Sequence, residues 1–319
     1  MLLSVENLSV CIGSVEPLSG ISFAVDRGEI LGLVGESGSG KSLTALACMG
    51  LLPLIGGRIS TGSITFDGHL LDNPEVALAK LRGRRIALIT QNPMTALDPV
   101  QRVGEQIDVM CRLHLGFTQS QARARTLELM TQLRIPEAAA VADSYPHQLS
   151  GGMKQRIVIA MALAGDPDLI IADEPTTALD VTVQAQIIQI LGQLVRERGV
   201  GLVLITHDMG VVAQVCDRVA VLYAGRLAET RDVGALFASP GHPYSAALIA
   251  CIPREGMAPG SLTGIPGTVP SVATYAQGCR FHPRCTRASG PCLTDRPDPT
   301  PLPQGGTLAC HHPLEASHG

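Results

Sequence analysis

The stretch GLVGESGSGKSLT, residues 32–44, places four glycines and three serines around Lys41. Glycine adopts positive φ at no steric cost, so backbone N–H groups in such a turn can converge on an anion. The segment from Gly35 to Ser42 matches G-x-x-x-x-G-K-[ST], a spacing in which backbone amides cradle phosphates. The stretch therefore predicts a phosphate-binding loop.

The flanking sequence supports this loop. Residues 29–34 (EILGLV) predict a buried strand, and the residues after Lys41 are helix formers. A glycine-rich surface turn is the alternative, but it would leave the strand and the Lys-Ser ending unexplained. We expect the phosphates of a nucleotide and Mg²⁺ here, with Lys41 balancing phosphate charge and Ser42 ligating the metal. The predicted loop contacts are Gly35, Ser37, Gly38, Ser39, Gly40, Lys41, Ser42 and Leu43.

Further apolar runs predict an α/β fold with a mainly parallel core sheet. Buried strands are expected at 84–90, 168–174 and 201–208, and a helix lies between the last two. Hairpins are expected at 62–71, with Asp67-Gly68 at the turn, and at 217–230. Apolar residues three and four apart predict helices between about 102 and 147.

Composition excludes several classes of protein. A net charge of −4 without a long basic run, and 3% aromatic residues, argue against nucleic acid as the main partner. The longest apolar stretches, such as 157–164, are too short to cross a bilayer. The N-terminus lacks the pattern of a secretion signal, so we expect a cytosolic chain with reduced cysteines.

Two adjacent acids follow the strand predicted at 168–174. Asp173, at the carboxyl end of an apolar run, can reach Mg²⁺ directly or through water. Glu174 is our candidate general base, because a carboxylate near the terminal phosphate can polarise the attacking water. Alone, an Asp-Glu pair at a strand end is more often a solvated turn; the phosphate loop favours the catalytic reading.

Five motifs in unbroken order resemble those of ATP-binding cassette (ABC) ATPases over residues 1–252: the phosphate loop, Gln91 at a strand end, LSGG at 149–152, DE followed by TTALD, and THD. The resemblance implies that Gln91 senses Mg²⁺ and the attacking water, and that His207 contacts the γ-phosphate. It also implies two sites shared between two ATPase chains. Ser150, Gly151 and Gly152 would face the partner's nucleotide, and Asp180 would cross the dimer interface.

One position departs from that family. An aromatic residue usually stacks on adenine near the end of the first strand, where this sequence has Cys11 and Ile12. Ile12 offers only aliphatic contact, so we expect modest selectivity for the base.

The C-terminal part indicates a branch of the family. Two segments, residues 90–107 and HPYSAALIACIP, are similar to ATPase subunits of dipeptide, oligopeptide and nickel importers. A third segment, GCRFHPRC, resembles the C-terminal extension of the peptide-importer subunits. The resemblance implies that this extension can bind a [4Fe-4S] cluster. Independently of this resemblance, four soft thiols in a short Pro-rich tail favour a structural metal site. The candidate ligands are Cys279, Cys285, Cys292 and Cys310, with His282, His311 and His312 as possible substitutes. Zinc is the second choice, and reduced cysteines without metal the third.

The expected organisation is an ABC ATPase domain at 1–252, with an antiparallel β subdomain and a helical subdomain at about 92–165, and a Pro/Gly/Cys-rich extension at 253–319. The resemblance implies an importer ATPase at the cytoplasmic face of the inner membrane, taking up di- or oligopeptides. Its expected partners are a second, related ATPase, two transmembrane permeases and an extracytoplasmic binding protein. Alternatives are import of nickel or glutathione, and a soluble ABC ATPase with a metal-sensing tail.

Overall fold

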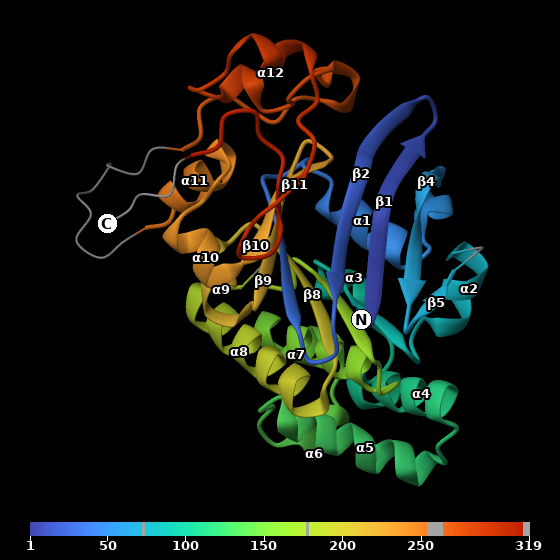
Figure 1. Ribbon diagram of the computed structural model, residues 1–319. Helices are drawn as coiled ribbons and strands as arrows, with labels where there is room; N and C mark the ends of the chain where they lie inside the picture. The colour runs from blue at the N-terminus through green and yellow to red at the C-terminus, as the bar shows by residue number, and fades with distance from the viewer. Residues whose placement is uncertain (72–73, 177–178, 254–263, 315–319) are drawn as a thin grey trace. The chain divides into compact units, whose positions relative to one another are not determined.

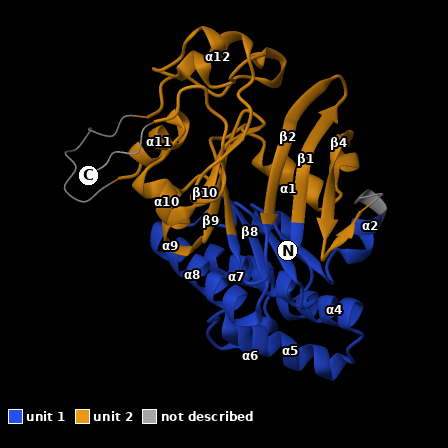
Figure 2. Ribbon diagram, viewed as in Figure 1, with its two compact units in different colours: residues 1–3, 25–30, 73–205 blue, residues 4–24, 31–72, 206–319 orange. Residues whose placement is uncertain are grey.

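The computed structural model describes residues 1–71, 74–176, 179–253 and 264–314, and it divides into two compact units (Figure 1, Figure 2). The first unit contains residues 1–3, 25–30 and 73–205, and the second contains residues 4–24, 31–72 and 206–319. Each unit therefore combines segments that lie far apart in the sequence.

Three parallel strands form the centre of the first unit. They lie in the order β8 (Gly201–Thr206), β7 (Leu169–Asp173) and β6 (Ile86–Ile89), with Leu169 opposite both Gly201 and Ile86. Every residue of β8 is buried, and so are the first four of β7. Continuous apolar runs of this kind are typical of strands covered on both faces. The parallel arrangement predicted for this part of the chain is confirmed.

Helices make up most of the rest of the first unit. The helical pattern predicted between 102 and 147 is confirmed, and α4, α5 and α6 pack on one another, with α4 and α5 also on α7 (Figure 1). Thr118 and Gln121 form a capping box at the start of α5, which satisfies backbone N–H groups that a helix leaves open. The helices are α2 (Pro74–Leu81), α3 (Pro93–Ala96), α4 (Val103–Leu115), α5 (Gln119–Gln132), α6 (Ala138–Ala142), η2 (Pro146–Gln148), α7 (Gly151–Leu163) and α8 (Val181–Arg198).

The second unit contains a mixed set of strands in the order β11 (Thr300–Pro301), β12 (Thr307–Leu308), β10 (Arg226–Asp232), β9 (Arg218–Tyr223) and β3 (Ile30–Val34). β3 and β9 are parallel, whereas β10, β12 and β11 pair antiparallel. The β9–β10 pair confirms the hairpin predicted at 217–230. Leu308 lies opposite Glu229, so the C-terminal segment extends this sheet rather than standing apart from it.

A separate antiparallel sheet of the second unit has the order β2 (Val15–Val25), β1 (Leu3–Ile12), β4 (Gly57–Phe66) and β5 (His69–Leu70). Asp67 and Gly68 both have positive φ, 52° and 78°, as the predicted two-residue turn requires. The helices of this unit are α1 (Lys41–Cys48), η1 (Leu52–Ile55), α9 (Met209–Val215), α10 (Val233–Ala238), α11 (Pro243–Ala250), η3 (Val272–Thr274), η4 (His282–Arg284) and α12 (Gly290–Thr294). None of the described helices of the chain is long and apolar enough to cross a membrane.

Candidate active site

The phosphate loop joins β3 to α1 in the second unit, which confirms the predicted strand, loop and helix. Gly35, Gly38 and Gly40 have φ of 155°, 80° and 107°. A Cβ on Gly35 would lie 2.1 Å from the Leu222 carbonyl oxygen, and one on Gly40 would lie 2.6 Å from Leu18 Cδ2. The close approaches at Gly35 and Gly40 therefore leave no room for a side chain, whereas Gly38 serves the loop only through its positive φ.

Lys41, the first residue of α1, lies inside the loop and is 5% exposed. Its Nζ donates to the carbonyl oxygens of Gly35 at 2.8 Å and Glu36 at 3.0 Å. Ser39 Oγ is buried and has no hydrogen-bond partner among the described residues. A buried ammonium group, an unpaired hydroxyl and a helix N-terminus together suit a bound phosphate. The loop thus fits the predicted group.

The predicted acids lie in the first unit. Asp173 is the last residue of β7, and Glu174 follows it with φ 46°, while its N–H donates to the Ile205 carbonyl at 2.9 Å. The left-handed conformation at Glu174 ends the regular alternation of side chains between the two faces of the strand. The side chains of Asp173 and Glu174 therefore do not simply point to opposite faces of the sheet. A non-glycine residue in this conformation costs about 1 kcal/mol or more, and such strain is concentrated at functional sites.

Gln91 contacts the predicted base. Its Nε2 donates to Glu174 Oε2 at 3.1 Å. The strand that was expected to reach Gln91 ends earlier, because β6 stops at Ile89 and Asn92 then caps α3. Gln91 therefore lies in a bend between strand and helix, which allows its amide to turn towards Glu174.

The predicted signature residues begin α7. Ser150 is its N-cap and accepts from the Met153 N–H at 3.3 Å, and both Ser150 and Gly151 are exposed. A Cβ on Gly152 would lie 2.8 Å from Val183 Cγ1, which explains glycine there. Asp180 is exposed and caps α8 by accepting from the Val183 N–H at 2.9 Å. Residues 177 and 178 of the TTALD motif lie outside the described residues.

The remaining nucleotide candidates lie in the second unit. His207 is exposed, directly after β8, and Asp208 then caps α9 by accepting from the N–H groups of Gly210 and Val211. Ile12 is half-buried at the end of β1. A Cβ built on Gly57 would contact its Cγ1 at 3.4 Å, so Ile12 borders β4.

The four C-terminal cysteines share one neighbourhood. The N–H of Cys279 donates to the Cys292 carbonyl at 2.9 Å. The pKa of the Cys310 thiol is raised to about 11, mainly by burial, and the nearby thiols of Cys279, Cys285 and Cys292 contribute to this rise. Among the described residues, however, no three His, Cys, Asp or Glu side chains are grouped closely enough to hold a metal ion.

The candidate substitute ligands make other contacts. His282 Nδ1 lies 2.9 Å from the Cys279 carbonyl, His311 Nε2 lies 2.8 Å from the Asp295 carbonyl, and His312 contacts Ser289 Oγ. The thiols and imidazoles are thus present without a preformed ion site, and the metal of the extension stays a prediction. Of the other cysteines, Cys48, Cys111 and Cys216 are buried as expected for core residues, and Cys11 and Cys251 are half-buried.

A cavity of about 420 Å³ lies elsewhere in the second unit. It is lined by parts of β1, β2, β9, β10 and the C-terminal segment, including Cys279 and Arg280. Among the described residues, none of those predicted for the nucleotide lines it. The cavity is therefore separate from the phosphate loop.

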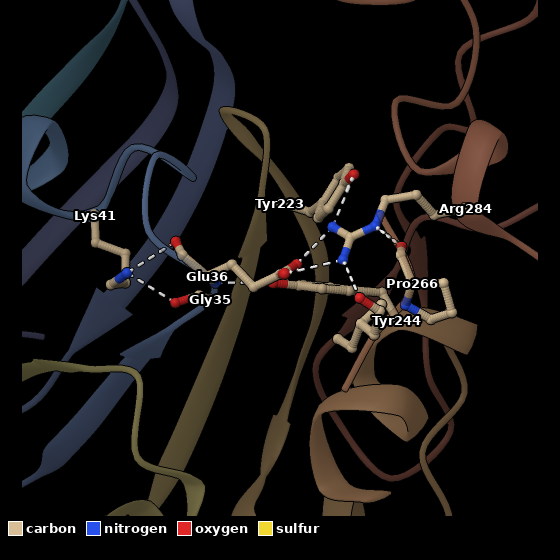
Figure 3. A network of polar contacts seen from close by, with 8 residues as sticks. Gly35, Glu36, Lys41, Tyr223, Tyr244, Pro266 and Arg284 are labelled. Carbon is tan, nitrogen blue, oxygen red and sulfur yellow. Dashed lines mark hydrogen bonds and ion pairs between the residues drawn. The ribbon is translucent and has the colours of Figure 1, made fainter. Parts of the chain in front are cut away.

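Sequence reasoning missed the residues that hold the loop at Glu36. Its carboxylate accepts two hydrogen bonds from Arg284, and its N–H donates to the Tyr244 hydroxyl at 2.9 Å (Figure 3). The only signal in the sequence was a charged residue within a loop of glycines and serines. Its partners lie more than 200 positions away.

Known protein families and curated relatives match this chain over most of its length. The ABC transporter family matches residues 18–177, and the family described as the oligopeptide/dipeptide transporter C-terminal region matches residues 228–292. The dipeptide transport ATP-binding protein DppD of Escherichia coli is 44% identical over 98% of this chain and 97% of its own length. The oligopeptide transport ATP-binding protein OppD of Salmonella typhimurium is 45% identical over 99% and 95%.

Solved structures give the same result for the fold. CbiO1 of Clostridium perfringens, part of the ABC transporter complex cbiONQ, superposes with a TM-score of 0.66 at 28% identity, covering 74% of this chain and 90% of that one. The dimeric ATP-binding cassette MJ0796 bound to ADP and Pi superposes with a TM-score of 0.63 at 28% identity, covering 73% and 99%.

The chain belongs to the ABC transporter ATPases, and it is an ATP hydrolase with the α/β fold of that class. Within the family it belongs to the dipeptide and oligopeptide branch, as the match at 228–292 and the near full-length relatives establish.

Proposed function

We propose that this chain binds and hydrolyses ATP to power uptake of di- or oligopeptides through two permease subunits at the cytoplasmic face of the inner membrane. The observation that carries the proposal is that one chain combines a phosphate loop around a buried lysine with the C-terminal region found in peptide transporters. We place the ATPase domain at 1–252, with its helical subdomain at about 92–165, and the extension at 253–319.

In this proposal the phosphate loop binds the triphosphate. Lys41 exchanges its contacts with the Gly35 and Glu36 carbonyls for phosphate oxygens, because a phosphate is the stronger acceptor for a buried ammonium group. The N–H groups at the start of α1 bind the same phosphates, and Ser42 and Asp173 are the residues that would hold Mg²⁺. Bound Mg²⁺ neutralises charge that develops on the phosphoryl oxygens. Ile12 contacts adenine.

Glu174 acts as the general base. It takes a proton from the water that attacks the γ-phosphorus, a bond forms between the water oxygen and phosphorus, and the bond to the bridging oxygen of ADP breaks. Gln91, which donates to Glu174, orients this carboxylate and senses Mg²⁺. His207 contacts the γ-phosphate.

Each site is completed by a second ATPase chain, which we expect to be a related subunit. Ser150, Gly151 and Gly152 lie at the exposed start of α7, where N–H groups favour an anion, and they would face the partner's γ-phosphate. Asp180 would meet the partner across the interface. ATP then favours the closed pair, and hydrolysis releases it, since only the triphosphate binds both chains.

Transport by the reconstituted complex tests the proposal. The chain, assembled with its second ATPase and permeases in proteoliposomes and supplied with the peptide-binding protein, should take up a labelled dipeptide only with Mg-ATP. Lys41→Ala should abolish uptake. Uptake of Ni²⁺ or glutathione, but not of peptides, would contradict the substrate assignment.

We also propose a [4Fe-4S] cluster on Cys279, Cys285, Cys292 and Cys310. The proposal is supported by the donor set, which is four soft thiols in one neighbourhood. An iron–sulfur cluster also needs its ligands farther apart than a single metal ion does. Anaerobically purified protein should be brown and contain iron and sulfide. Zinc alone, or no metal, would contradict the cluster.

A further inference from the structure

Arg284 joins the C-terminal extension to the phosphate loop. Its Nη1 and Nη2 donate to the two carboxylate oxygens of Glu36 at 2.7 and 2.9 Å, which is a bidentate ion pair (Figure 3). Planar fork-to-fork pairs of this kind are among the strongest polar contacts in proteins and have a defined orientation. All the residues involved lie in the second unit.

The extension also orients Arg284 itself. Nε donates to the Pro266 carbonyl at 2.7 Å, and Nη2 also donates to the Ile265 carbonyl at 3.1 Å. These two contacts within the extension fix the orientation of the guanidinium that pairs with Glu36. Contacts with Glu36 raise the pKa of Arg284 above its usual value, so it stays charged.

The ion pair is largely shielded from water. The side chain of Arg284 is 5% exposed and that of Glu36 is 27% exposed. Tyr223, Tyr244 and Phe281 form a cluster of rings with centroids 4.7 to 5.2 Å apart, and the guanidinium carbon lies 5.8 Å from the Tyr223 centroid and 6.0 Å from that of Phe281. Aromatic faces attract the cation, and low local polarity strengthens the charge pair.

The loop is fixed at Glu36 through both backbone and side chain. The Tyr244 hydroxyl accepts from the N–H of Glu36, and both Tyr244 and Arg284 lie in the region matched by the peptide-transporter C-terminal family. A loop with three positive-φ glycines loses much conformational freedom when it is ordered. An unpaired carboxylate beside it would also repel an incoming triphosphate.

We propose that Arg284 is a positioning residue for ATP binding: it orders the phosphate loop and neutralises Glu36, so the C-terminal extension sets the nucleotide affinity of the cassette. This inference rests on the ATP-binding function. Arg284 contacts neither the reacting phosphorus nor the attacking water in this role, so it should affect binding more than turnover.

The test compares Arg284→Gln with Arg287→Gln in the full-length protein. Arg287 is exposed and lies three positions away in the same segment, so it is the matched control. Arg284→Gln should raise the Kd for Mg-ATP about tenfold, with kcat at saturating ATP changed less than about twofold. Arg287→Gln should bind Mg-ATP as wild type does.

A double-mutant cycle with Glu36→Gln separates the effect of losing the Arg284–Glu36 ion pair from a general destabilisation of the protein. Arg284→Gln should have little further effect on Kd in the Glu36→Gln background, because its partner is already gone. The penalty of Arg284→Gln should also shrink at high salt, since screening weakens the repulsion between Glu36 and ATP. Full additivity of the two changes would overturn the proposal.

Arg284→Lys covers the case in which Arg284→Gln does not fold. Lysine keeps the positive charge but cannot form the bidentate pair with Glu36, so the Kd for Mg-ATP should rise by an intermediate amount. Wild-type affinity for Mg-ATP in folded Arg284→Lys would overturn the inference. Wild-type protein that fails to bind Mg-ATP would instead contradict the ATP-binding function itself.

Discussion

The amide of Gln91 donates to the carboxylate of Glu174 across 83 positions of sequence, with Nε2 and Oε2 3.1 Å apart. Gln91 lies just after β6 and Glu174 just after β7, so two neighbouring parallel strands bring them together at the carboxyl edge of the sheet. Polar groups from different strands meet at this edge in open α/β sheets. The contact links the proposed base to the residue that we expect to sense the nucleotide.

Glu174→Gln should abolish most ATP hydrolysis. The amide cannot accept the proton of the attacking water, and general-base catalysis contributes about 10²- to 10⁴-fold to rate. Binding of Mg-ATP should persist, and the assembled pair of ATPases should stay closed, as cross-linking or size-exclusion chromatography would measure. Glu105→Gln, at an exposed carboxylate of α4, is the control. Undiminished steady-state turnover in Glu174→Gln would remove it from the role of base.

Gly35→Ala should destabilise the second unit. The new Cβ would lie 2.1 Å from the Leu222 carbonyl oxygen, so β9 or the loop must move, and overpacking typically costs about 1 to 3 kcal/mol. The free energy of unfolding without nucleotide measures the effect. Gly38→Ala is the matched control, because its Cβ meets nothing within 4 Å, and the cost there should be only about 1 kcal/mol of backbone strain. Equal losses in both variants would contradict the role of close approach.

Ile12→Tyr should tighten ATP binding. An aromatic ring in place of an aliphatic side chain can stack on adenine, and stacking contributes about 1 to 3 kcal/mol per base in nucleic-acid systems. The Kd for Mg-ATP should fall at least about fivefold, with a smaller change for inorganic triphosphate, which has no base. A wild-type protein that strongly prefers ATP to GTP, or an unchanged Kd in the variant, would place adenine away from Ile12.

His242 should make the folded state sensitive to mild acid. It is 3% exposed, and its Nδ1 accepts from the Tyr244 N–H at the start of α11. Burial lowers its pKa from 6.5 to about 4. Between these values the unfolded chain binds a proton that the folded chain does not, so the free energy of unfolding falls as pH drops from 6.5 to 4, by up to about 3 kcal/mol.

His242→Asn should reduce that slope. Asparagine also caps helices but does not titrate in this range, so the variant isolates the imidazole. Chemical denaturation at several pH values measures the slope, and His69→Asn, at an exposed histidine of β5, should retain the wild-type dependence. An identical slope in wild type and His242→Asn would rule out this histidine as the source.

The local motifs were predictable from the sequence because they depend on neighbouring residues. Glycine spacing around Lys41 predicted the loop, apolar runs predicted β3, β6, β7 and β8, and Asp67-Gly68 predicted its turn. The strand predicted at 84–90 is shorter in the structure, where β6 spans Ile86–Ile89, because the bend at Gln91 depends on the cap that Asn92 gives α3.

Contacts between distant segments were decided only by the tertiary structure. Arg284 and Glu36 are 248 positions apart, and no local periodicity relates them. Their pairing depends on how the aromatic cluster of Tyr223, Tyr244 and Phe281 packs, which is a property of the folded chain. The sequence by itself thus determined the strand, glycine-rich loop and helix around Lys41. Folding decided which residues hold that loop in place, because a long-range ion pair forms only when packing of the core brings its two partners together.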